Sequence, residues 1–123
     1  MASIFTDAGK AIVTNRLKGA GTEPNYIAWG TGAGTSGATD TDLFAESSEA
    51  RVAGISSQAT TTVANDTYQV VGTMTVAGAS KTITNVGLFD ATSAGNVLVK
   101  SNFTGIALNV GESIQFTQKL VFG

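Results

Sequence analysis

TITNVGLFDATSAGNVLVKSNFTGIALNVGESIQFTQKLVF, residues 82–122, is the stretch that decides the fold. The final strand of this stretch has the clearest pattern, because its residues alternate between two sides. One side carries Ile114, Phe116, Gln118, Leu120 and Phe122. The other side carries Ser113, Gln115, Thr117, Lys119 and Val121. Successive side chains of a strand point to opposite faces, so this pattern predicts a strand with one face on a core and the other toward water.

The chain upstream carries further strand signals, in which β-branched and aromatic residues alternate with polar ones between turn residues. We expect strands at 26–29, 51–63, 67–77, 82–90, 97–104 and 112–122. Gly54 lies where Val52 falls out of phase with Ile55, as expected at a β-bulge. Asn65-Asp66 and residues 90–96 are expected to form hairpin turns.

The N-terminal stretch IFTDAGKAIVTNRLK, residues 4–18, predicts one amphipathic helix. Apolar residues recur there at roughly helical spacing, namely Ile4, Phe5, Ala8, Ile12 and Leu17. Thr6 or Ser3 can cap the start, and Gly9 is a weak point in the helix. One helix and six or more antiparallel strands predict a mainly β protein, an antiparallel β-sandwich or jelly-roll-like domain. We expect a single domain over 1–123, with the helix within 1–20 and the sandwich over 26–123.

The composition excludes several classes of function. The chain has no Cys and no His, which excludes thiol nucleophiles, Ser-His dyads and zinc sites built from these residues. Its seven Lys and Arg residues are scattered and the net charge is −2, so the clustered positive charge that nucleic acid requires is absent. No apolar run approaches the length that spans a bilayer. We therefore expect no catalytic residue, cofactor, metal, nucleic acid or membrane.

Residues 32–37, GAGTSG, match the G-x-G-x-x-G pattern of dinucleotide-binding turns. That function needs a helix that opens at the third glycine of a βαβ unit, with an acidic residue about 20 residues further on. Here a hairpin follows instead of a crossover helix. The pattern therefore favours a flexible loop, or a loop that contacts a partner.

The loop also contains four acidic residues, Asp40, Asp42, Glu46 and Glu49. A calcium loop requires a glycine and further oxygen ligands where Phe44 and Ala45 stand, and no spacing marks a glycosidase pair. A solvated face, or a cap for a helical turn at 42–45, is the preferred interpretation. Trp29 can pack in the core or face a ligand. Ile4 and Phe5 can staple the helix to its own core or insert into a neighbouring subunit.

Three segments, in this order, resemble proteins of tailed-bacteriophage virions. The first is FTDAGK (5–10) followed by IAWGTG (27–32), which is similar to a helix with a T-[DN]-A-G-[KR] start and a strand that ends in a glycine-rich turn. The second is ITNVGLFD (83–90) followed by GNVL (95–98), and the third is VGESI (110–114) before the last strand. Asn85 departs from the pattern, in which an acid is usual.

The resemblance implies a non-enzymatic structural protein of the virion. Two kinds fit: a capsid decoration or cement protein on the outer shell, and a tail-fibre, tail-collar or receptor-binding module of the tail. Fibre and collar proteins with this opening continue into long repetitive shafts, whereas this chain stops at Gly123, and its charge balance is acidic. Both features favour the decoration protein.

The expected partners are the major capsid protein and copies of the chain itself, as a dimer or trimer, with other virion or tail proteins as further candidates. The protein is expected to be made in the cytoplasm of a bacterial host and to function in the virion. Contact surfaces are expected on the helix at 4–18 and the loop at 30–40. The individual contact residues that we predict are Ile4, Phe5, Trp29, Gly32, Gly34 and Phe44.

Overall fold

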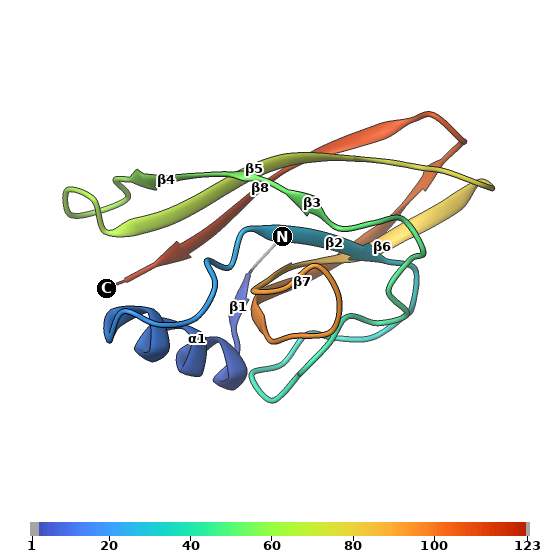
Figure 1. Ribbon diagram of the computed structural model, residues 1–123. Coiled ribbons are helices and arrows are strands. Elements are labelled where there is room, and N and C mark those ends of the chain that lie inside the picture. Colours follow the sequence, from blue (N-terminus) through green and yellow to red (C-terminus); the bar gives the residue numbers. More distant parts are fainter. Residues whose placement is uncertain (1–2, 123) are drawn as a thin grey trace.

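The computed structural model describes residues 3–122, which form one helix and eight strands (Figure 1). In chain order these are β1 Ile4–Phe5, α1 Asp7–Leu17, β2 Tyr26–Gly30, β3 Val52–Ala53, β4 Ile55–Ala59, β5 Thr67–Thr75, β6 Lys81–Phe89, β7 Val97–Leu108 and β8 Ser113–Val121. The strands build two antiparallel sheets. This confirms the predicted mainly β sandwich with a single helix near the N-terminus.

The larger sheet, sheet A, has the strand order β1-β7-β6-β2-β3, and the smaller, sheet B, has the order β4-β5-β8. Sheet B covers one face of sheet A (Figure 1). The first part of the long loop between β2 and β3, residues 31–51, lies on the side of sheet A away from sheet B, and its last part rises along the edge of the sandwich to β3 (Figure 1). α1 packs beside β7. Two of the edge strands, β1 and β3, have only two residues each.

The chain passes from sheet A to sheet B at Gly54. β3 pairs with β2, with Val52 opposite Ile27, whereas β4 pairs with β5, with Ile55 opposite Val71. A Cβ atom at Gly54 would lie 2.9 Å from the carbonyl oxygen of Val71, so the packing there leaves no room for a side chain. The break in alternation at Gly54 therefore does not mark a bulge within one strand, as predicted. It marks the point where the chain leaves β3 in sheet A and enters β4 in sheet B.

The core lies between the two sheets. Its largest fully buried side chains include Trp29, Ile27, Met74, Ile83 and Leu88. β8 confirms the predicted alternation, since Phe116, Gln118 and Leu120 are buried, Ile114 on the same side is half-buried, and the residues between them are exposed. Phe122 departs from it: the side chain lies beyond the end of β8 and is 49% exposed.

Ile4 and Phe5 do not belong to the helix, contrary to the prediction. They form β1 and pair with Lys100 and Val99 of β7. Thr6 then caps α1, because its Oγ1 accepts a hydrogen bond from the Gly9 N–H at 2.9 Å. A two-residue strand that leads directly into a helix has apolar residues at the same spacing as a longer helix, so periodicity alone could not separate the two.

Gly9 is explained by the packing of α1 on β7. A Cβ atom at this position would lie 2.4 Å from the carbonyl oxygen of Leu98 and 2.9 Å from its Cα. The helix therefore approaches the strand more closely than any other residue type would allow. Gly9 lowers the helix propensity of the segment, but it is also the residue that allows α1 to pack closely against β7.

Three further segments differ from the predictions. Residues 60–66 form a loop instead of strand and a two-residue turn, and the Asp66 carboxylate there accepts hydrogen bonds from the N–H groups of Thr61, Thr62 and Val63. Residues 42–45 contain bends and no helical turn. β7 extends to Leu108, four residues beyond the predicted end.

Candidate contact sites

Two ion pairs fasten the loop at 31–51 onto the sandwich, and a third joins two residues within the loop. Three of its four acidic side chains each pair with a different cation, in the pairs Asp40–Lys100, Glu46–Arg51 and Glu49–Lys81. The partners are separate and the carboxylates do not converge. Among residues 3–122 there is no group of three or more acidic side chains able to hold a metal ion. These three acidic residues thus hold the loop in place, where the sequence favours a solvated face or a cap for a helical turn at 42–45.

Lys100 is the most deeply buried of these cations, with 1% of its side chain exposed. Its Nζ lies 3.0 Å from Asp40 Oδ2 and 3.4 Å from the centre of the Phe44 ring. A lysine at this depth requires such partners, because an isolated buried charge is strongly unfavourable. The hydrogen bond from the Gly37 N–H lowers the pKa of Asp40, and partial burial raises it. The interaction with Lys100 lowers the pKa further, so that it lies below its ordinary value.

The glycine-rich segment of the loop wraps around Phe44. Cβ atoms at Gly32 and Gly34 would lie 2.7 Å from the Phe44 carbonyl carbon and 2.7 Å from its ring, respectively. The segment is therefore shaped by close packing on Phe44, at a place where the sequence indicates a flexible loop or a loop that contacts a partner. Gly37 differs from both, because a Cβ atom there would meet nothing within 4 Å.

Asn85 ties this loop to sheet A. Its side chain is fully buried on β6. Nδ2 donates to the Phe44 carbonyl oxygen and Oδ1 accepts from the Phe44 N–H, both at 3.0 Å. The side-chain amide offers a donor and an acceptor on one planar group, whereas an ionised carboxylate can only accept. These two hydrogen bonds account for an amide at position 85.

Glu49 anchors the other end of the loop in a polar cluster. Its carboxylate accepts hydrogen bonds from Trp29 Nε1 and from the Ala77 N–H, both at 3.0 Å, and from Lys81 and Ser47. Burial would raise the pKa of Glu49, but these hydrogen bonds outweigh burial and hold the pKa well below its ordinary range. Trp29 itself is 1% exposed, so its side chain lies in the core and not on a contact surface.

The other predicted contact residues fall into two groups. Ile4 and Phe5 are half-buried on β1, at one edge of sheet A. Gly32, Gly34 and Phe44 come together in the loop, on the side of sheet A away from sheet B. The structure thus brings the second group together. Ile4 pairs across strands with Lys100, whose Nζ lies over the Phe44 ring, whereas Phe5 contacts Phe122.

An open seam separates the two sheets along one side of the sandwich. β1 pairs with only Val99 and Lys100 of β7, so that edge of β7 has no strand partner from residue 101 to residue 108 within the described part of the chain. β8 forms the adjacent edge of sheet B. A groove of about 510 Å³ runs between them and is lined by Phe103, Thr104, Ile106, Ile114, Gln115, Phe116 and Thr117.

The seam carries no charged side chain among its lining residues and includes Ile106, which is 41% exposed. Unpaired strand edges beside apolar side chains are a ready site for a partner chain. The sequence predicted a strand at 97–104 here. It did not predict that this edge stays unpaired, because sheet order is a long-range property.

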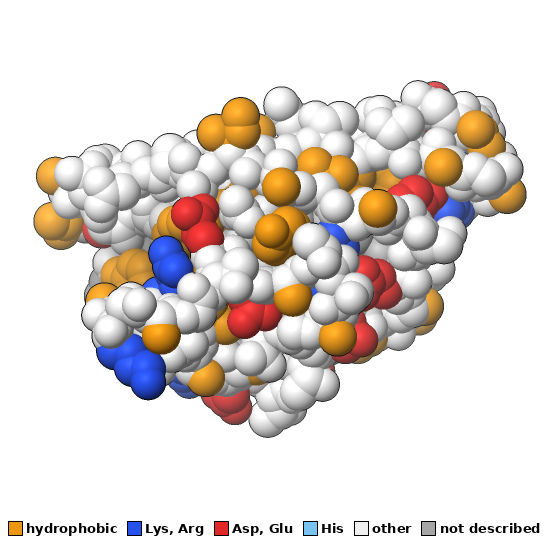
Figure 2. All heavy atoms as spheres, viewed as in Figure 1, with side chains coloured by type: hydrophobic (Ala, Val, Ile, Leu, Met, Phe, Trp, Pro, Cys, Tyr) orange, Lys and Arg blue, Asp and Glu red, His pale blue; other side chains and the backbone are white. Residues whose placement is uncertain are grey.

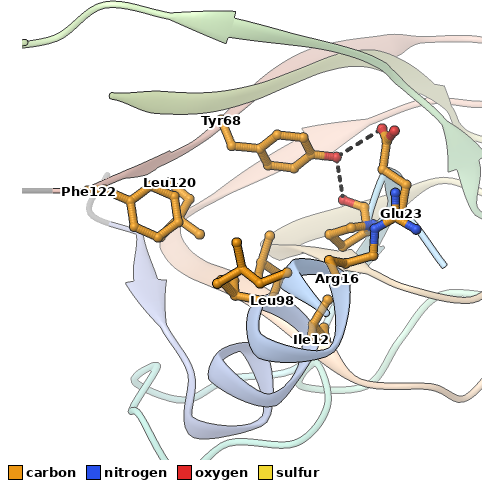
Figure 3. Close-up of a pocket in the computed structure, with 10 residues that line it drawn as sticks. Ile12, Arg16, Glu23, Tyr68, Leu98, Leu120 and Phe122 are labelled. Atoms are coloured by element: carbon orange, nitrogen blue, oxygen red, sulfur yellow. Dashed lines mark hydrogen bonds between the residues drawn. The ribbon is translucent and has the colours of Figure 1, made fainter. Parts of the chain in front are cut away.

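A second groove, of about 340 Å³, lies between α1 and the ends of β5 and β8 (Figure 3). Leu98 and Ile12 form its base and Leu120 and Phe122 one end, while Arg16 and Glu23 stand together at the other end. Tyr68 spans the groove, and its hydroxyl donates to Glu23 Oε2 at 3.1 Å. Burial, followed by the charge of Glu23, raises the pKa of Tyr68. Nothing in the sequence had singled out this groove.

The surface view shows apolar side chains in the cleft between sheet B and α1, with basic and acidic side chains at its border (Figure 2). Other exposed apolar side chains are scattered over the strands and turns, namely Ile55, Val63, Val110 and Val121. Scattered apolar residues are ordinary on a protein surface, whereas apolar residues gathered in a groove indicate a contact site.

Comparison of the chain with protein-family models, with curated proteins and with solved structures finds no match in any of the three. Within residues 3–122, no helix is both long enough and apolar enough to cross a membrane. The candidate sites are therefore interpreted from their own geometry.

Proposed function

We propose that this protein is a non-enzymatic structural protein of a bacteriophage virion, namely a decoration protein that binds the assembled capsid shell. The observation that carries the proposal is the open seam between β7 and β8, an uncharged apolar groove between two unpaired strand edges. Such an edge suits an extended segment of another protein, because main-chain hydrogen bonds give affinity and the groove takes alternate side chains. The resemblance of residues 83–90 to phage virion proteins supports the identity of that partner as the major capsid protein.

The mechanism would be mass action. A protein that binds the assembled shell, and not its free subunits, stabilises the shell by the free energy of binding. Many copies on one shell would sum modest affinities into a large effect. The ionic side chains of the loop at 31–51 would keep the module rigid during binding, since most of them are already paired within the chain.

The test uses phage particles and purified protein. The protein should be located on the capsid surface by cryo-electron microscopy, and shells stripped of it should open at lower temperature and recover when it is added back. Ile106→Asp should abolish this recovery. Val110→Asp is the matched control, because Val110 is 55% exposed and does not line the seam.

Two outcomes would contradict the proposal. Finding the protein only in the tail would favour the tail-fibre, tail-collar or receptor-binding alternative. Shells of equal stability with and without the protein would remove the stabilising role itself.

A further inference from the structure

The groove between α1 and the ends of β5 and β8 has an apolar base and an exposed apolar side chain at its border. Leu98 and Leu120 line it from β7 and β8. Leu17, in the last turn of α1, also lines it and is 82% exposed, the highest value among the large apolar side chains of residues 3–122. A projecting leucine and an apolar hollow therefore share one surface.

The same groove carries one cation and one anion. Arg16 and Glu23 both line it, and neither takes part in an ion pair within the described chain. Arg16 Nη1 donates to the Gly21 carbonyl oxygen at 2.9 Å, and the Glu23 carboxylate accepts, within residues 3–122, only from the Tyr68 hydroxyl. Figure 3 shows the two charged side chains at the same end of the groove.

We propose that a second copy of this chain covers the groove across a two-fold axis. A two-fold interface presents the same patch from both sides, so the patch must complement itself. The charges of this patch complement each other, because rotation about an axis near its charged end places Arg16 of each copy opposite Glu23 of the other. Its shape is also complementary to itself, since Leu17 of each copy can enter the apolar groove of the other.

This dimer surface is distinct from the seam between β7 and β8, and the inference does not rest on a role in a virion. Both Leu17 and Phe122 would leave water in the dimer, which is the main favourable contribution to such interfaces. The reciprocal charge pairs would determine the orientation of the two copies more than their affinity.

The test is the association state of the purified full chain, measured by sedimentation equilibrium over a concentration series. The wild type should form dimers. Arg16→Glu and Glu23→Arg should each weaken dimerisation by about tenfold or more, because each variant faces its own charge across the axis. Leu17→Ser should weaken it as well. Lys10→Glu is the matched control, with the same charge change on the same helix but outside the groove.

The decisive measurement is a mixture of Arg16→Glu with Glu23→Arg. One variant then presents two anions and the other two cations, so a heterodimer should form although neither variant forms a homodimer. An effect of each substitution on the fold of its own chain could not restore association when the two variants are mixed. A monomeric wild type, dimers that are insensitive to these substitutions, or a mixture that stays monomeric would each overturn the proposal. Circular dichroism of each variant separates loss of association from loss of fold.

Discussion

The side-chain amide of Asn85 holds the main chain of Phe44 by two hydrogen bonds, donating to its carbonyl oxygen and accepting from its N–H, each at 3.0 Å. The two residues are 41 positions apart in the chain. Phe44 in turn lies under Lys100 and inside the glycine-rich segment. One buried amide thus determines where the loop at 31–51 lies on sheet A.

Asn85→Asp should destabilise the protein by about 2–3 kcal/mol, because a carboxylate cannot donate to the Phe44 carbonyl oxygen and instead places a buried negative charge against it, leaving that oxygen only the hydrogen bond from the Gly32 N–H. Urea unfolding followed by tryptophan fluorescence measures the change. Asn102→Asp is the matched control: the Asn102 side chain only accepts, from the Ser36 N–H, and a carboxylate keeps that bond. Equal losses in the two variants would contradict the role of the donor.

Gly9→Ala tests which of two opposing effects is larger. Helix propensity favours alanine by about 1 kcal/mol. The new Cβ atom, however, would lie 2.4 Å from the Leu98 carbonyl oxygen, so α1 must move off β7. Overpacking of this kind costs about 1–3 kcal/mol, and we expect a net loss of stability. Thr14→Ala, at an exposed position of the same helix, should be neutral or slightly stabilising. A gain in stability for Gly9→Ala would show that the close contact is absent.

Glu49 should make the protein sensitive to acid. The pKa of Glu49 in the folded state lies below its ordinary value of 4.5, so the unfolded chain binds the proton more tightly. Its contribution to stability is therefore complete above that value and is lost as the pH falls toward the folded pKa. Urea unfolding between about pH 7 and pH 3 should show a decreasing free energy of unfolding.

Glu49→Gln should lower the stability at neutral pH and flatten this pH dependence. The control is Asp7→Asn, because Asp7 is exposed in a surface pair with Lys10 and should change stability by less than about 1 kcal/mol. A pH profile of Glu49→Gln as steep as that of the wild type would assign the acid sensitivity to other groups. Asp40 and Asp66 are the next candidates, since the folded-state pKa of each is also lowered.

Gln118→Met should stabilise the protein by about 1–2 kcal/mol. Gln118 is 1% exposed on the core side of β8, and neither its Nε2 nor its Oε1 has a hydrogen-bond partner within the described structure. Replacing an unpaired buried amide by an apolar side chain of similar length removes that cost. Gln115→Met, on the exposed face of the same strand, should change stability by less than about 0.5 kcal/mol. A loss of stability in Gln118→Met would show that the amide is paired in solution.

Some features followed from local sequence because their causes are local. The alternation at residues 114–120 identified the buried face of β8, Gln118 included, since the two-residue period of a strand is a property of the strand itself. Thr6 was identified as a possible cap, because its side chain bonds an N–H group only three residues away. The phase change at Gly54 was also visible, although its meaning was not.

Other features were decided by residues far apart in the chain. Ile4 and Phe5 form a strand because they pair with β7. Lys100 can be buried because Asp40 forms an ion pair with its ammonium group and the Phe44 ring makes a cation–π contact with it. The glycine-rich segment is closely packed because Phe44 occupies its centre.

The sequence by itself determined the fold class, most of the strands and the buried face of the last one, because hydrophobic periodicity acts over a few residues. The tertiary structure alone decided which strand edges stay open and where apolar and charged side chains meet in a groove. Those properties depend on the order of strands in the sheets, and strand order arises from pairing between distant segments that no local pattern encodes.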